Sequence, residues 1–259
     1  MPPSNVIRAN VLGVGVSAVD MPNALRLSVE RLRQRQKGYI CVTGAHGIIE
    51  AQRDPRLLQI LNSAFLCVPD GMPTAWVGRL QGHHGMRRVY GPDFMIELCR
   101  LSVESGYRHF LYGGGTGVAE KLKRSLEKQI AGIQIAGICT PPFRPMTAAE
   151  EQALLEQVTA LRPDIFWVGL STPKQERFMA AMLERLDTCL MVGVGAAFDL
   201  HAGLRADAPA LIKSCGLQWL HRLLQEPERL WRRYAEIVPR FLWDSALQFT
   251  GVKKFRLNS

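Results

Sequence analysis

Long hydrophobic runs are missing from this 259-residue sequence. A membrane-spanning helix needs about 18 or more consecutive apolar residues, and no stretch approaches that length. Residues 1–5, Met-Pro-Pro-Ser-Asn, also lack the charged-then-apolar pattern of a secretory signal peptide. We therefore expect a cytoplasmic protein that has no membrane-spanning segment.

Motifs for metal binding, redox chemistry and nucleotide loops are missing as well. The six cysteines stand far apart without a Cys-x-x-Cys pair, which indicates buried thiols rather than a zinc site or disulfides. His83 and His84 are adjacent but have no His-Glu-x-x-His motif, so we interpret them as loop histidines. Neither a Walker loop nor a complete G-x-G-x-x-G fingerprint is present. The sequence predicts no metal and no cofactor.

The composition that remains is that of a folded domain with a basic end. Hydrophobic residues make up 47% and charged residues 21%, which is enough for a sizeable core. The net charge is +9, and from Lys213 onward nine Lys and Arg stand against four Asp and Glu. Such a segment attracts phosphate groups. Composition alone leaves open whether these belong to nucleic acid, an anionic lipid or a diphosphate ligand.

Strand and helix patterns alternate over the first 200 or so residues, which favours an α/β fold. We predict a mostly parallel, Rossmann-like sheet with helices on both faces. Apolar runs predict strands at 10–16, 39–42, 65–68, 108–111, 133–138, 165–170 and 189–193. Helical spacing predicts helices at 20–36, 48–51, 74–80, 94–104, 118–129, 147–161 and 175–186.

The pattern changes to helix alone from about Leu217 onward, so we predict an α/β domain over 1–211 and a helical appendage over 212–259. Arg222, Arg229 and Arg232 stand at i, i+7 and i+10, which places them on one face if the axis bends little at a proline. Tryptophans and other aromatics are interleaved with these arginines. That mixture suits a membrane surface, and it suits equally a pair of helices packed on the core.

Polar or glycine-rich turns follow several predicted strands, where open α/β sheets bind ligands. Asp70 follows the strand 65–68 in a Pro-Asp-Gly turn. It is either a carboxylate that faces a ligand cleft or an ordinary turn residue. Gly113 and Gly114 follow the strand 108–111, where glycines allow phosphate to approach the backbone or simply allow tight packing.

Six motifs taken together make the sequence resemble the WecG/TagA/CpsF family of bacterial glycosyltransferases, glycosyltransferase family 26, from about residue 10 to 234. They are Val68-Pro-Asp-Gly-Met72, Arg88-Val-Tyr-Gly-Pro-Asp93, Phe110-Leu-Tyr-Gly-Gly114, Trp167-Val-Gly-Leu-Ser-Thr-Pro-Lys-Gln-Glu176, Gly193-Val-Gly-Ala-Ala-Phe-Asp199 with Ala202-Gly203, and Gly216-Leu-Gln-Trp-Leu-His-Arg-Leu223 with Glu226-Pro-Glu-Arg-Leu-Trp-Arg-Arg-Tyr234.

This resemblance implies an inverting transfer of a sugar from a UDP-sugar to a polyprenyl (undecaprenyl) diphosphate-linked sugar, for cell-surface polysaccharide synthesis. The enzyme would be a hexosyltransferase similar to N-acetylmannosaminyltransferases, peripheral on the inner leaflet of the cytoplasmic membrane. The family lacks a metal-binding Asp-x-Asp, and none occurs here, so metal-independent catalysis is implied. No nucleic-acid partner is implied, and a homo-oligomer is left open.

The resemblance also implies roles for individual residues. Asp70 falls on the general base, and Thr43 on a polar residue of the same pocket. The substrate-contacting positions are Arg88, Gly113, Gly114, Gln175, Gly195 and Asp199, and the appendage supplies Arg222, Arg229 and Arg232, which are assigned to the catalytic group.

Three departures from the family pattern are visible. Ala45 replaces the asparagine of a Thr-x-Asn motif, so contacts to a donor or acceptor sugar are expected to differ. Ser171 stands where Gly or Ala is common, and Asp207-Ala208-Pro209 varies the usual Arg-Ala-Pro. An alternative function is a nucleotide- or nucleic-acid-binding regulator that uses the basic tail, although no recognition motif accompanies it. A redox enzyme on a dinucleotide fold ranks last, because the glycine fingerprint is incomplete.

Overall fold

The computed structural model describes residues 6–257, apart from the side chains of residues 210, 214 and 229. Its centre is a six-stranded sheet in the order β4-β3-β8-β7-β5-β6, and every neighbouring pair is parallel. The strands are β3 (Gly38–Thr43), β4 (Leu66–Pro69), β5 (Arg108–Gly113), β6 (Gln134–Cys139), β7 (Ile165–Gly169) and β8 (Leu190–Gly193). The predicted α/β class with a parallel sheet is confirmed.

Helices cover both faces of this sheet, because the side chains of each buried strand alternate between two apolar clusters. In β7, Ile165 and Trp167 pack on one side, and Phe166 and Val168 pack on the other. The first side is covered by α1 (Met21–Arg33), α5 (Gly91–Glu104), α6 (Val118–Gln129) and α9 (Ala197–His201). The second is covered by α2 (Ala45–Ala51), α3 (Pro55–Ser63), α7 (Ala148–Leu161) and α8 (Lys174–Met182).

The single strand predicted at 10–16 is wrong, because this stretch forms a hairpin. Strands β1 (Arg8–Val11) and β2 (Val14–Ser17) pair antiparallel in a separate two-stranded sheet. The two-residue turn places Leu12 at φ 52° and Gly13 at φ 82°, and left-handed residues of this kind match the twist of a tight hairpin. Helix α3 was also missed, although Asp54 caps it by accepting from Arg56 N at 3.0 Å.

The imidazole of His109, a buried residue of β5, is hydrogen-bonded at both ring nitrogens by neighbouring side chains. Trp167 Nε1 donates to His109 Nδ1 at 3.0 Å, so the ring proton lies on Nε2 and faces Ser102 Oγ at 2.7 Å. Ser102 in turn donates to the Cys99 carbonyl at 2.6 Å. Burial lowers the pKa of His109 to about 3, so this histidine is neutral and serves packing.

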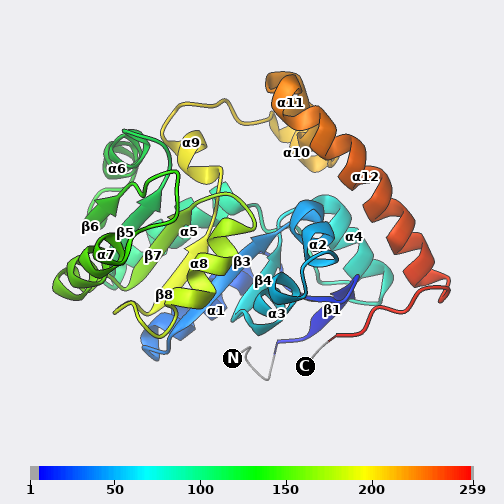
Figure 1. The fold of residues 1–259 in the computed structure, drawn as a ribbon, viewed down its shortest axis with the longest axis horizontal. Coiled ribbons are helices and arrows are strands. Elements are labelled where there is room, and N and C mark those ends of the chain that lie inside the picture. Colours follow the sequence, from blue (N-terminus) through cyan, green and yellow to red (C-terminus); the bar gives the residue numbers. More distant parts are fainter. Residues whose placement is uncertain (1–5, 258–259) are drawn as a thin grey trace.

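The C-terminal helices α10 (Ala210–Ser214), α11 (Gln218–Gln225) and α12 (Pro227–Phe249) return along one side of the molecule (Figure 1). Helix α12 packs on α2, and Ile237 and Phe241 are buried in the core. Gln248 Nε2 also donates to the Asn10 carbonyl at 2.8 Å. Residues 212–257 are therefore joined to the α/β body by packing as well as by the chain.

Within residues 6–257, no helix combines the length and apolarity that crossing a membrane requires. The remaining helix, α4 (Met72–Leu80), begins directly after the turn that carries Asp70.

Candidate active site

A cavity of about 1040 Å³ opens at the carboxyl edge of the parallel sheet. Its wall is built from the turns that follow all six strands and from the C-terminal helices. Parallel strands present their carboxyl ends at one edge, so side chains far apart in the sequence meet there. Of the predicted site residues, the cavity wall includes Asp70, Arg88, Gly114, Gln175, Gly195, Asp199 and Arg222.

Asp70 occupies the first position after β4 and is half-buried in this wall. Its backbone N–H donates to the Thr43 carbonyl at 3.1 Å, which ties the turns after β3 and β4 together. The Gly91 N–H donates to Asp70 Oδ1 at 3.0 Å and so orients the carboxylate. Asp70 is thus a fixed carboxylate inside a cleft, as a general base requires.

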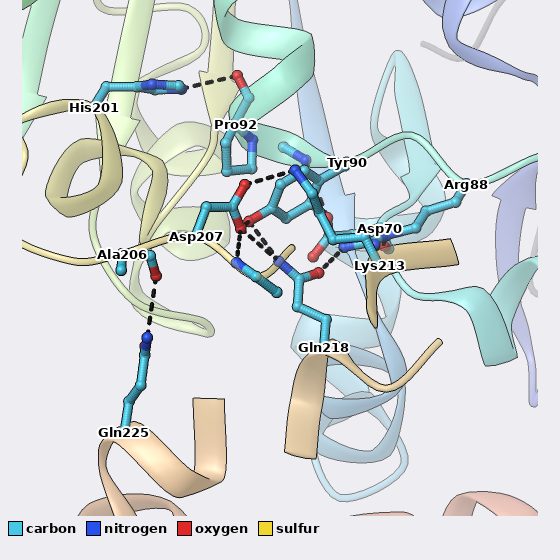
Figure 2. Close-up of polar contacts among 12 residues, drawn as sticks. Asp70, Arg88, Tyr90, Pro92, His201, Ala206, Asp207, Lys213, Gln218 and Gln225 are labelled. Carbon is cyan, nitrogen blue, oxygen red and sulfur yellow. Dashed lines mark hydrogen bonds and ion pairs between the residues drawn. The ribbon is translucent and has the colours of Figure 1, made fainter. Parts of the chain in front are cut away.

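Arg88 and Tyr90 form the connection between the Asp70 turn and the C-terminal helices (Figure 2). The Arg88 guanidinium donates to the Asp70 carbonyl and to Gln218 Oε1, and it lies 4.3 Å from the centre of the Tyr90 ring. The Tyr90 hydroxyl donates to Asp207 Oδ1 at 2.8 Å. Asp207, one of the departures noted in the sequence, is therefore part of a polar network that borders the cavity.

Gln175 lines the cavity near the turn after β8, and Glu176 is buried beside it. Gln175 Nε2 and Thr172 Oγ1 both donate to Glu176 Oε1, at 3.1 and 2.9 Å. This fixes the Gln175 amide with Oε1 buried and lacking a hydrogen-bond partner among the described residues. A Cβ at Gly195, where φ is 50°, would come 3.4 Å from that oxygen. Gln175 Oε1 is thus a buried acceptor next to the Gly195 part of the cavity wall.

The glycine loop after β5 is shaped mainly by packing. A Cβ at Gly113 would lie 2.6 Å from the backbone of Gly169, and the φ of Gly113 is 127°. Gly114 lines the cavity, but its N–H already donates to the Gly169 carbonyl at 3.0 Å. That N–H is therefore committed to the protein backbone, and Gly113 is required where β5 and β7 approach each other.

Asp199 stands on α9 in the cavity wall and is paired with an arginine. Arg205 Nε lies 3.1 Å from Asp199 Oδ2, and the same guanidinium donates to Glu226. Glu226 is the residue at which α11 ends and α12 begins. The ion pairs therefore join the loop after β8 to the break between the C-terminal helices.

The break at Glu226, with φ −137° and ψ 60°, changes which arginines enter the cavity. Arg222 lines the cavity as predicted, whereas Arg232 is exposed and lies 5.5 Å over the ring of Trp231. Arg233, which the sequence analysis did not select, lines the cavity instead. The periodicity of one continuous helix does not carry across two helices with different axes. The side chain of Arg229 lies outside the described part of the chain.

The first turn of α2 places His46 in the cavity wall, whereas Thr43, the last residue of β3, is buried. Thr43 is 3% exposed and does not line the cavity. Burial, together with a smaller effect of the nearby Arg233, lowers the pKa of His46 to about 4, so the imidazole is neutral near pH 7. A neutral imidazole both donates and accepts hydrogen bonds. The sequence analysis missed this residue, although the adjacent Ala45 departure marked the turn.

Comparison with known proteins identifies the family of this chain. The model of the Glycosyl transferase WecG/TagA/CpsF family matches residues 9–254. A Bacillus spizizenii protein named N-acetylglucosaminyldiphosphoundecaprenol N-acetyl-beta-D-mannosaminyltransferase is 29% identical over 204 residues, which cover 78% of this chain and 77% of that protein. A Staphylococcus aureus protein of the same name is 24% identical over 259 residues, which cover 95% of this chain and 97% of that protein.

The match spans nearly the whole chain, including the C-terminal helices that complete the cavity. It also favours a transferase over the nucleic-acid-binding regulator considered from the basic tail. The chain belongs to the WecG/TagA/CpsF family of glycosyltransferases.

Proposed function

We propose that this enzyme transfers N-acetylmannosamine from its UDP derivative to N-acetylglucosamine linked to undecaprenyl diphosphate, in the synthesis of a cell-surface polymer. The names of the Bacillus and Staphylococcus relatives support this choice of sugars. The observation that carries the proposal is the fixed carboxylate of Asp70 in the same cavity as Arg222 and Arg233. That set provides a base and cations for a leaving diphosphate.

In the proposed reaction, Asp70 takes the proton of the acceptor hydroxyl as the oxygen attacks the anomeric carbon of the donor. The carbon–oxygen bond to the diphosphate breaks on the opposite face, which inverts the anomeric configuration. The proton moves as the new bond forms, so a carboxylate is basic enough for this step. The Gly91 N–H, at 3.0 Å from Oδ1, holds the carboxylate in place for this transfer.

The leaving UDP gains negative charge, and we assign its stabilisation to Arg222 and Arg233, which line the cavity. Removing one well-placed donor of this kind typically lowers turnover by about 100-fold or more. Roles for Arg229, Arg232 and Thr43 stay predictions from the sequence. Arg232 would need to move to reach a diphosphate in this cavity, because it is exposed and does not line the cavity.

The sugar contacts are proposed for the turn after β3 and for Gln175. His46 occupies the turn in which Ala45 replaces the usual asparagine, and as a neutral ring it can bond a hydroxyl or acetamido group. Gln175 also lines the cavity, so we assign it a contact to the donor. We expect sequence differences at these two positions to change the donor preference among relatives.

We also propose that the C-terminal helices contact the inner leaflet, where a polyprenyl-linked acceptor would lie. Large apolar side chains stand exposed on them, including Leu224 at 75%, Trp231 at 53% and Trp243 at 67%. The same segment is basic, so it combines apolar anchors with attraction to anionic headgroups. Sedimentation with anionic and neutral liposomes tests this contact, and equal recovery with both would remove the electrostatic part of the proposal.

A donor screen tests the proposed reaction. The purified chain is incubated with a short-chain lipid diphosphate–GlcNAc acceptor and, in separate reactions, with UDP-ManNAc, UDP-ManNAcA, UDP-glucose, UDP-galactose and UDP-GlcA. We expect transfer from UDP-ManNAc and a product of inverted configuration. Transfer from a different donor alone would replace the proposed sugar, and absence of transfer from all five would reject the proposed reaction.

A further inference from the structure

Segment 88–91 sets the orientation of the carboxylate that we propose as the base. Its Gly91 N–H donates to Asp70 Oδ1 at 3.0 Å, the Val89 N–H donates to the Pro69 carbonyl at 2.8 Å, and the Arg88 guanidinium donates to the Asp70 carbonyl. Three contacts thus run from four consecutive residues to the end of β4. A displacement of this segment would turn the Asp70 carboxylate with it.

The opposite side of the segment is bound to Asp207, in the loop that leads to α10 (Figure 2). Asp207 Oδ1 accepts from the Tyr90 hydroxyl at 2.8 Å and from Gln218 Nε2 at 3.2 Å. Gln218 Nε2 also donates to the Tyr90 hydroxyl at 2.6 Å, while its Oε1 accepts from Arg88. Asp207 therefore binds Tyr90 of segment 88–91 and Gln218 of α11. These two side chains join the segment to the C-terminal helices.

The charges of this network agree with the hydrogen bonds. Burial raises the pKa of Asp207, but donation from Lys213 at 2.7 Å and from Tyr90 outweighs burial and lowers that pKa overall. Burial, followed by the bond to Asp207, raises the pKa of the Tyr90 hydroxyl, which therefore remains a donor. Lys213 and Gln218 lie on α10 and α11, so the network is complete only while those helices sit against segment 88–91.

Asp207 does not line the main cavity, whereas Tyr90, Arg88 and Gln218 do. It lines a smaller pocket that shares Tyr90 and Gln218 with the main cavity, so it acts on the main cavity through these neighbours. We propose that Asp207 is a positioning residue, which fixes Tyr90 and Gln218 so that segment 88–91 presents the Asp70 carboxylate to the acceptor hydroxyl when the C-terminal helices are docked. The inference rests on the proposed role of Asp70.

Two variants of Asp207 and one control test this inference in the full-length chain. D207A removes the acceptor of the Tyr90 and Gln218 bonds, and we expect kcat to fall by about 10- to 100-fold, the range for hydrogen bonds to a charged group, with the KM for the UDP-sugar unchanged. D207N keeps an acceptor oxygen and is expected to recover part of that loss. Q225A removes another contact of α11, the 3.3 Å bond to the Ala206 carbonyl, and should leave kcat near the wild-type value.

A double-mutant cycle separates positioning from a general loss of stability. If Asp207 acts through Tyr90, D207A should lower kcat much less in a Y90F background than in the wild type. If the effects of D207A and Y90F on kcat multiply in full, the inference is overturned. It is also overturned if D207A behaves like Q225A while D70N is inactive. Normal transfer by D70N would instead reject the proposed role of Asp70. If D207A does not fold, D207N in the same cycle gives the measurement.

Discussion

Replacement of Asp70 by asparagine is the most direct test of the site. Asparagine is nearly isosteric and can still accept from the Gly91 N–H that now lies 3.0 Å from Oδ1. The backbone bond from residue 70 to the Thr43 carbonyl is unaffected, so we expect folding and UDP binding to be retained. What is lost is the ability to take a proton. General-base catalysis typically contributes about 10²- to 10⁴-fold, so kcat should fall by that factor, or about 2.7 to 5.4 kcal/mol in transition-state stabilisation.

The assay for this variant combines turnover with an independent measure of binding. Transfer to the short-chain acceptor gives kcat, and isothermal titration with UDP gives the affinity of the nucleotide part of the site. D187N serves as the matched control, because Asp187 is exposed and does not line the cavity. Turnover by D70N within a few-fold of the control would refute the assignment of Asp70 as base. If D70N loses both UDP binding and turnover, Asp70 has a binding role instead.

Further predictions concern the arginines, the metal requirement, the glycine loop and the buried histidine. R222A should lower kcat by about 100-fold or more in the transfer assay. Dialysis against EDTA should leave transfer unchanged, as metal-independent catalysis requires; a loss restored by Mg²⁺ would contradict it. G113A should lower the free energy of unfolding by at least about 2 kcal/mol in urea titrations, because the added Cβ meets the Gly169 backbone at a φ of 127°. Between pH 7 and 5 the wild type should lose about 2 kcal/mol more stability than H109Q, since the unfolded histidine binds a proton below about pH 6.5 and the folded one only near pH 3.

The direction of that last effect follows from proton linkage. The folded state keeps His109 neutral, whereas the unfolded state takes up a proton as the pH falls through its ordinary pKa. The contribution of this residue is therefore complete above about pH 6.5 and is lost progressively toward about pH 3. Equal pH dependence of wild type and H109Q in urea titrations would show that the histidine is solvated or charged in the folded state.

The sequence by itself determined the parallel sheet and the presence of a carboxylate at its edge. The alternation of apolar runs with helical spacing specified the parallel α/β fold, because a strand buried on both faces needs a continuous apolar run and a crossover helix. The Pro69-Asp70-Gly71 turn also placed a carboxylate at the end of a strand, a position that the local sequence pattern is enough to indicate. The hairpin of β1 and β2 was missed, because the apolar run 10–16 predicts one strand and the left-handed turn at Leu12 gave no separate signal.

Tertiary structure alone decided which distant side chains complete the site. The break at Glu226 turns Arg233 into the cavity and leaves Arg232 exposed, and helical periodicity read along the sequence cannot include such a change of axis. Asp207 looked like a departure in a loop, yet folding brings it to Tyr90 across 117 positions of the chain. Local patterns encode which elements form, because they depend on near neighbours. The partners of a charged side chain depend on how those elements pack, which no short stretch of sequence records.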